Sequence, residues 1–208
     1  MALKMQDEQK EQSYSSSDLL EFRLEIQNWL KKNKPSDPGF LLPQTFMEIG
    51  SEQVLDFLRE WQYTLWSSGC LGMSWPREHG GRGLPRIFQQ IADEEMKSAR
   101  VPICFNIIGL GWAGPLIIDI GSEDEKRLYL KGILSGDDLW CQGFSEPNHG
   151  SDLGSIQTRA EKVEDGYLLN GSKIWTTMGN FAKYMILLAR TNPIAERRYD
   201  GLSCFLAP

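Results

Sequence analysis

The sequence has no run of basic residues longer than a pair, and its formal net charge is −6. Nucleic-acid binding needs a basic face that displaces counterions from the phosphates. This charge pattern therefore argues against a nucleic-acid partner. It leaves room for a small anionic ligand, because a few local charges or a helix N-terminus can hold a phosphate within an acidic protein.

The sequence also lacks any pair of cysteines at metal-binding spacing. Its four cysteines are widely scattered: Cys70, Cys104, Cys141 and Cys204. This arrangement is typical of buried small hydrophobic side chains rather than of a disulfide framework or a metal site. We therefore expect reduced thiols, no bound metal and a cytoplasmic location.

We expect no targeting or membrane-spanning segment either. The first 17 residues are polar and contain no apolar core of the kind that signal peptides have. The longest apolar stretch, residues 103–120, is interrupted by Asn106, by glycines and by Pro115. A membrane span needs about 20 mainly apolar residues, so we interpret this stretch as a buried segment.

Helical periodicity is present over the first two thirds of the chain. Apolar residues recur at helical spacing in the segments 19–30, 54–65, 87–96 and 125–133. Asp18 is the predicted N-cap of the first helix, and Ser122 with Glu125 forms a capping box for the last. Between the second and third segments, residues 72–83 contain four glycines, which predicts a tight backbone path rather than a regular element.

Strand patterns take over after Gly136. The predicted strands are 139–144, 156–163, 167–169, 173–177, 184–189 and 202–206. Asp165-Gly166 and Asn170-Gly171 are hairpin-turn signals between them. The sequence thus predicts an α+β fold: a flexible tail (1–16), an all-helical domain (17–137), and an antiparallel β domain that is incomplete (138–208).

Two segments of the β region carry candidate chemistry. The segment 142–152 is a loop rich in hydroxyls and glycine, which suits hydrogen bonding to a planar heterocycle or an anion, although a solvated loop would look the same. On the predicted strand 173–177, alternation would place Trp175 and Thr177 on one face, where they could form a wall for a flat ring system. The alternative is a core tryptophan beside a strand-favouring threonine.

Together these segments resemble the acyl-CoA dehydrogenase family. The resemblance to that family's middle domain is carried by CQGFSEPNHGSDLGSIQTRAEKVEDGYLLNGSKIWTTMGNFAKYMILLART. It extends back through LGMSWPREHGGRG and forward to GLSCFLAP, about 190 residues in all, far more than a lone short motif.

The resemblance implies bound FAD and assigns residues to it. It places Gln142, Phe144 and Ser145 on the flavin ring, Trp175 beside the isoalloxazine, and Thr177 near the reactive flavin nitrogen N5. The implied cofactor-binding set is Gln142, Phe144, Ser145, Gly150, Ser151, Trp175, Thr176 and Thr177. Ser151 would also contact the acyl-CoA substrate.

Several residues depart from the family pattern or carry two interpretations. Thr176 replaces an apolar residue and should face away from the flavin. His149 is either a solvated imidazole or a contact to phosphate or a proton donor. His79 is expected at the surface, and the pattern makes Glu146 structural rather than catalytic. The small residues Gly109, Gly111, Ala113 and Gly114 leave room for an acyl chain or for close helix packing.

The activity implied is FAD-dependent oxidation of an acyl-CoA thioester to the 2,3-enoyl thioester in lipid metabolism. An electron-transferring flavoprotein or similar acceptor and a homotetrameric assembly follow from the same resemblance. The general base is expected beyond Pro208, so the 208-residue chain alone is expected to be inactive. The alternatives are a flavin-dependent monooxygenase or nitroalkane oxidase on the same fold, and a non-catalytic interaction module.

Overall fold

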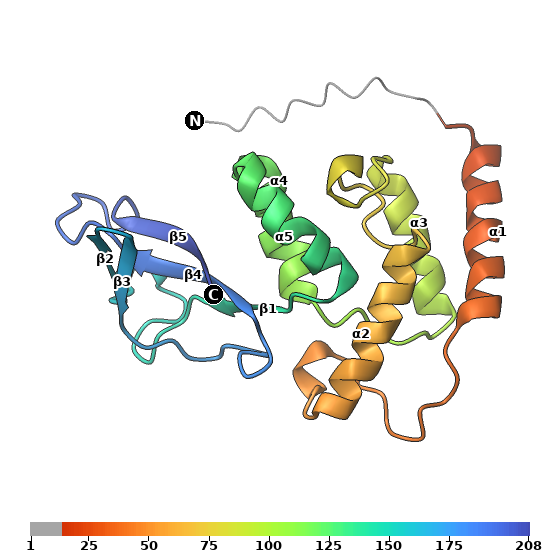
Figure 1. The fold of residues 1–208 in the computed structure, drawn as a ribbon, viewed down its shortest axis with the longest axis horizontal. Coiled ribbons are helices and arrows are strands. Elements are labelled where there is room, and N and C mark those ends of the chain that lie inside the picture. The colour runs from red at the N-terminus through yellow and green to blue at the C-terminus, as the bar shows by residue number, and fades with distance from the viewer. Residues whose placement is uncertain (1–13) are drawn as a thin grey trace.

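The computed structural model describes residues 14–208, and these form a helical part and a sheet part (Figure 1). Residues 1–13 of the predicted tail lie outside the described residues. The ring of Tyr14 already packs against Phe88, with 4.7 Å between the ring centroids. The first helix begins at Ser16. No helix in the described part of the chain combines the length and the apolar character needed to cross a bilayer.

The helical part contains five α-helices. They are α1 (Ser16–Asn33), α2 (Glu52–Ser67), α3 (Arg86–Ser98), α4 (Gly114–Ile120) and α5 (Glu123–Ser135). All four segments with predicted helical periodicity form helices, namely α1, α2, α3 and α5. The capping box of Ser122 and Glu125 is confirmed at the start of α5.

The predicted cap of α1 was wrong. The Oγ of Ser15 accepts a hydrogen bond from the Asp18 amide, and the Asp18 carboxylate accepts one from the Ser15 amide. Ser15 is therefore the N-cap and Asp18 is the third residue of the first turn. The helix starts earlier than predicted because Ser16 and Ser17 extend it without contributing apolar periodicity.

A buried polar network joins the helices to the sheet. The Gln62 side chain of α2 donates to the carbonyls of Ile133 and Leu134, and its oxygen accepts from the Asn106 amide. The Asn106 side chain donates to the Asp138 carbonyl and accepts from the Trp140 amide at 3.1 Å. Buried polar side chains persist only when such bonds are made. This network therefore fixes the position at which the chain passes from the helical part into the sheet.

The glycine-rich loop folds tightly, as predicted. A short 3₁₀ turn spans Arg77–His79, and the Gly83 amide donates to the Trp75 carbonyl at 2.8 Å. A β-carbon on Gly81 would collide with the Trp75 backbone. Glycine is required there for close approach of two chain segments.

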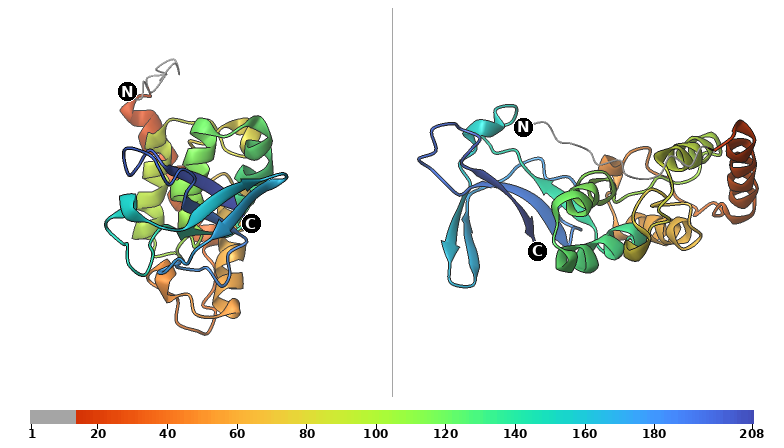
Figure 2. Two further views of the ribbon diagram at one scale, coloured as in Figure 1. Left: turned by 90° about the vertical axis from the view of Figure 1, so that its left-hand side faces the viewer. Right: turned by 90° about the horizontal axis from the view of Figure 1, so that it is seen from above.

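The sheet has five strands. They are β1 (Trp140–Gly143), β2 (Arg159–Val163), β3 (Gly166–Asn170), β4 (Tyr184–Arg190) and β5 (Leu202–Ala207). β4 is central: it pairs in parallel with β1, meets β2 in parallel at Arg190, and pairs antiparallel with β5. The β2–β3 hairpin projects beyond the rest of the sheet (Figure 2).

The α+β fold is confirmed, but the expectation of a wholly antiparallel sheet was wrong, because β1 and β4 run in the same direction. The Asp165-Gly166 turn forms the predicted hairpin. Asn170-Gly171 does not: β3 ends at Asn170, and residues 171–176 continue as an irregular segment. The strand predicted at 173–177 is therefore absent.

Candidate functional site

The candidate site is built around a buried ion pair. Glu146 is only 6% exposed, and its carboxylate accepts a hydrogen bond from Lys173 Nζ at 2.9 Å. The same carboxylate accepts from the amides of Gln157 and Thr158 at 2.6 and 2.8 Å. Lys173 Nζ also donates to the Phe144 carbonyl at 3.1 Å. One carboxylate and one ammonium thus hold three chain segments together.

The environment of Glu146 keeps it ionised. Burial opposes the charged form, but the hydrogen bond from Lys173 and the two backbone amides outweigh it, and the pKa falls to about 2. A carboxylate with so low a pKa is a poor proton acceptor near neutral pH. The structure agrees with the interpretation of Glu146 as a positioning group.

Residues 173–178 lie beside this ion pair in a conformation that the sequence did not predict. The Ile174 amide donates to the Ser145 carbonyl at 2.9 Å, which brings the two predicted flavin-contact segments together. Trp175 has a left-handed φ of 57° and Met178 one of 65°. The Thr177 amide donates back to the Trp175 carbonyl at 2.9 Å, within a turn. Strand alternation therefore cannot be used to place Trp175, Thr176 and Thr177 on faces.

The predicted contact residues differ widely in exposure. The Trp175 side chain is 84% exposed, although it is a large apolar group. Gln142 on β1, Phe144, Ser145, Thr176 and Thr177 are half-buried, whereas Gly150 and Ser151 are exposed beyond the turn at Pro147-Asn148. Phe144 lies near Trp112 of the helical part, with ring centroids 6.2 Å apart.

These residues fit a planar, hydrogen-bonding cofactor such as a flavin. Within residues 14–208 the hydroxyls of Ser145, Ser151, Thr176 and Thr177 form no hydrogen bond, so each remains free to donate to a ligand. An exposed tryptophan and hydroxyls without a partner among the described residues offer both an apolar contact and polar anchors. A β-carbon on Gly150 would meet open space, so the loop there is not filled by protein.

Lys173 is the site residue that the sequence analysis missed. Its signal was weak: a single lysine in a run that otherwise looked like a strand. A basic residue predicted to lie within a buried sheet needs a carboxylate partner, and Glu146 was the available one. That pairing accounts for the missing strand, because Lys173 and Ile174 bond to residues 144–146 instead of to a ladder.

The two histidines and the cysteines show further differences from expectation. His79 was expected at the surface but is buried, with its Nε2 3.9 Å from Glu123. His149 is half-buried, and its backbone pairs with Glu146. All four cysteines are free thiols; Cys70 and Cys141 are buried as expected, whereas Cys204 is exposed. Burial, and then the nearby Asp93, raises the pKa of the Cys104 thiol to about 12.

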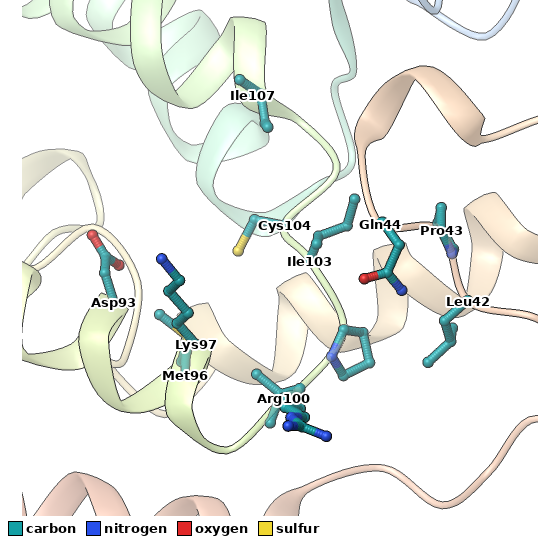
Figure 3. A pocket seen from close by; sticks show the side chains of 12 residues that line it. Leu42, Pro43, Gln44, Asp93, Met96, Lys97, Arg100, Ile103, Cys104 and Ile107 are labelled. Atoms are coloured by element: carbon teal, nitrogen blue, oxygen red, sulfur yellow. The ribbon is translucent and has the colours of Figure 1, made fainter.

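A large cavity lies in the helical part, away from these residues. It measures about 770 Å³ and is bounded by α3, by residues 42–44 and by residues 101–107. Figure 3 shows the side chains of Asp93, Lys97 and Cys104 around it. None of the eight predicted flavin-contact residues lines it.

The four small residues that the sequence analysis singled out have different roles: Gly109, Gly111, Ala113 and Gly114. A β-carbon on Gly109 would lie 2.6 Å from the Asn106 side chain, and one on Gly114 would collide with the Trp75 ring. Ala113 is fully buried. Gly111, by contrast, faces open space and lines an adjacent cavity with Leu110. Close packing explains Gly109 and Gly114, and only Gly111 leaves room for a ligand.

Comparison with known proteins identifies the family. The family profile described as acyl-CoA dehydrogenase, N-terminal domain, matches residues 45–137, and the one described as acyl-CoA dehydrogenase, middle domain, matches residues 141–208. The chain belongs to the acyl-CoA dehydrogenase family.

Individual relatives agree with this assignment. Acyl-CoA dehydrogenase IpdE1 of Mycolicibacterium smegmatis is 35% identical over 90% of this chain and 50% of its own. The solved Tcur3481-Tcur3483 steroid ACAD is 34% identical, with a TM-score of 0.75 over 94% of this chain and 48% of that one. A glutaryl-CoA dehydrogenase from Mycobacterium smegmatis, solved in complex with FADH2, shares the fold at 23% identity, with a TM-score of 0.63 over 93% of this chain and 46% of its own. The chain spans about half the length of these proteins.

Proposed function

We propose that these residues form the flavin-contacting part of an FAD-dependent enzyme that oxidises acyl-CoA thioesters to 2,3-enoyl thioesters. The observation that carries the proposal is the exposed Trp175 beside free hydroxyls, on a segment tied to residues 144–146. Bound FAD would supply the hydride acceptor for this chemistry. The protein supplies position and hydrogen bonds.

We assign the roles as follows. The Trp175 ring packs beside the flavin, and the Ser145 and Thr177 hydroxyls donate to its heteroatoms. Gln142 and Phe144 hold its edge, chiefly through the backbone. The exposed Gly150 contacts the cofactor, and the exposed Ser151 contacts both cofactor and substrate. Thr176 belongs to the same segment. Glu146 and Lys173 position both segments and touch neither ligand.

The general base is not assigned to any of these residues. Glu146 directly follows Ser145 in the chain, and its pKa of about 2 makes it unsuited to take the substrate α-proton. The domain boundaries we propose are 17–137 and 138–208. We also propose that the protein is cytoplasmic. Further proposed partners are an electron-transferring flavoprotein or similar acceptor and further copies of the chain in a homotetramer.

The test is to purify the product of the complete coding sequence and measure its flavin content and its activity. We expect bound FAD and formation of an enoyl-CoA with a dye acceptor. The substrate panel should include straight-chain, branched and ring-bearing acyl-CoA esters, since one relative is named a steroid ACAD. Oxygen-dependent hydroxylation or nitroalkane oxidation instead would favour those reactions on the same fold. A colourless protein without flavin would favour an interaction module.

A further inference from the structure

The large cavity of the helical part carries positive charge that the protein does not pair. Two cations line it, one in the last turn of α3 and one just after that helix: Lys97 and Arg100. Figure 3 shows both side chains among the residues around the cavity. Among residues 14–208, neither side chain has an ion-pair or hydrogen-bond partner. Their charge is therefore available to a ligand.

Lys97 has an acidic neighbour one helical turn away but does not pair with it. Asp93 precedes Lys97 by four residues on α3, which is a favourable spacing for a helical ion pair, and both line the cavity. The Asp93 carboxylate instead accepts a hydrogen bond from the Gln89 side chain at 2.9 Å. With one carboxylate against two cations, the lining keeps one positive charge in excess.

Arg100 occupies a backbone position that favours glycine. It follows α3 with a left-handed φ of 50°. Its amide donates to the Lys97 carbonyl at 3.2 Å, and the Val101 amide donates to the Met96 carbonyl at 3.3 Å. These two bonds are those of a Schellman motif, in which glycine is usual because a β-carbon disfavours the left-handed φ. The end of the helix thus gives no reason for an arginine here, and a residue held in a disfavoured conformation points to a function.

The remaining walls of the cavity suit an apolar body. Seven apolar residues from three segments of the chain line it: Leu42, Pro43, Met96, Val101, Pro102, Ile103 and Ile107. Its volume of about 770 Å³ is typical of a small-molecule site. The helix dipole favours cations at the end of α3, but it does not select an arginine over a glycine at a left-handed position. Apolar walls with one excess positive charge match an apolar molecule with one negative charge.

We propose that this cavity binds the carboxylate of a molecule with an apolar body, and that Lys97 and Arg100 hold that carboxylate. The planar fork of an arginine can donate two hydrogen bonds to one carboxylate, and a lysine adds a further donor. The apolar body then lies against the walls formed by residues 42–43 and 101–103.

Two sources can supply this carboxylate. One is a free apolar acid. The other is the far end of an acyl group whose thioester lies at the flavin surface, and this source rests on the proposed function. The cavity shares Cys104 and Ile107 with the adjacent cavity that Gly111 lines, and the next residue, Trp112, lies near Phe144. An acyl group could therefore extend from the flavin side towards the two cations.

The test is binding of octanoate to the 208-residue chain by isothermal titration calorimetry, with 1-octanol as the uncharged ligand of the same length. We expect saturable octanoate binding that weakens as NaCl is added, and binding of 1-octanol at least about tenfold weaker. Lys97→Gln should weaken octanoate binding about tenfold. The matched control is Lys162→Gln, which removes the same charge from an exposed lysine of β2 outside the cavity.

Arg100→Gly separates function from stability. Glycine suits the left-handed position, so this variant should unfold at a temperature about 2 °C or more above wild type. It should nevertheless bind octanoate about tenfold more weakly, because one charged partner is lost. A merely structural arginine would show the opposite pattern, with a lower unfolding temperature or an unchanged affinity, and either result would overturn the proposal.

Three further outcomes count against the site. These are absence of saturable octanoate binding, equal affinity for octanoate and 1-octanol, and an equal loss of affinity in the Lys97 and Lys162 variants. The titrations need neither flavin nor turnover, so the site can fail while the complete protein oxidises acyl-CoA esters.

The source is decided in the complete protein. The comparison is between octanoyl-CoA and the mono-CoA ester of octanedioic acid, which differ by a carboxylate at the far end. If the substrate supplies the carboxylate, Lys97→Gln should lower kcat/KM about tenfold for the carboxylated ester and leave octanoyl-CoA within about twofold. Equal effects on the two esters would assign the site to a free acid. Turnover of neither ester would contradict the proposed function and leave the octanoate result standing.

Discussion

At the scale of single residues, Glu146 shows how one buried carboxylate organises a candidate site. It is bonded to Lys173 and to the amides of Gln157 and Thr158, so it joins three chain segments next to the predicted flavin contacts. Breaking a buried ion pair by removing one partner leaves the other charge uncompensated, and costs roughly 3–5 kcal/mol in comparable cases. We therefore expect Glu146→Gln to lower the urea midpoint of unfolding at pH 7 markedly. An unchanged midpoint would contradict the role given to this pair.

The same residue predicts how stability depends on pH. The pKa of Glu146 is lowered in the folded state from its ordinary 4.5 to about 2, so its contribution is fully present above pH 4.5. That contribution is lost as pH falls through 4.5 towards 2, because protonation then favours the unfolded chain. Urea unfolding of the wild type at pH 7, 5, 4 and 3 should show a steep loss, and Glu146→Gln should lose less over this interval. Parallel curves for the two proteins would contradict the prediction.

Thr177 and Thr176 provide a matched pair for the proposed flavin contact. Both are half-buried, and neither hydroxyl has a partner among residues 14–208. A donor to the flavin should strengthen as negative charge develops on the ring during reduction. Thr177→Val in the complete protein should slow flavin reduction about ten- to a hundredfold. Stopped-flow measurement of both variants tests the assignment, and a rate for Thr177→Val within twofold of wild type would remove the assigned role.

At the scale of elements, the segment 103–120 illustrates how close packing uses glycine. Gly114 begins α4 against the Trp75 ring, whereas Gly111, one turn earlier, faces open space. Gly114→Ala should destabilise the protein by about 1–3 kcal/mol through overpacking. Gly111→Ala in the same helical segment should be neutral, or stabilising by up to about 1 kcal/mol, because alanine is the better helix former. Thermal unfolding of the two variants measures this, and a similar loss in both would show that packing against Trp75 is not the cause.

At the scale of the whole molecule, the proposed flavin surface is open on one side. Trp175 is 84% exposed, so residues 14–208 alone would contact a flavin over part of its surface. Binding costs at least about 4 kcal/mol in lost freedom before any affinity appears. We expect the isolated 208-residue chain to lose FAD on dialysis and to turn over no acyl-CoA with a dye acceptor, and we expect its circular dichroism spectrum to be that of a folded protein. Stoichiometric yellow flavin after dialysis would show that these residues suffice.

The sequence by itself determined the elements whose signals are local. Helical periodicity predicted α1, α2, α3 and α5, the Ser122–Glu125 capping box predicted where α5 begins, and Asp165-Gly166 predicted the β2–β3 hairpin. The motif between residues 142 and 177 was sufficient to indicate the family, because residue types at fixed spacing can be read without coordinates. Each of these features depends on residues within a few turns of one another, or on a contiguous motif.

Only the tertiary structure decided the arrangement of the candidate site. Residues 173–177 have the composition of a strand, yet Lys173 and Ile174 bond to residues 144–146 and draw the segment out of the sheet. The parallel pairing of β1 with β4 and the meeting of Arg159 with Arg190 arise from partners more than 30 residues apart. Such contacts depend on which buried charges and sheet edges find each other when the chain collapses, and local propensity carries no information about that choice.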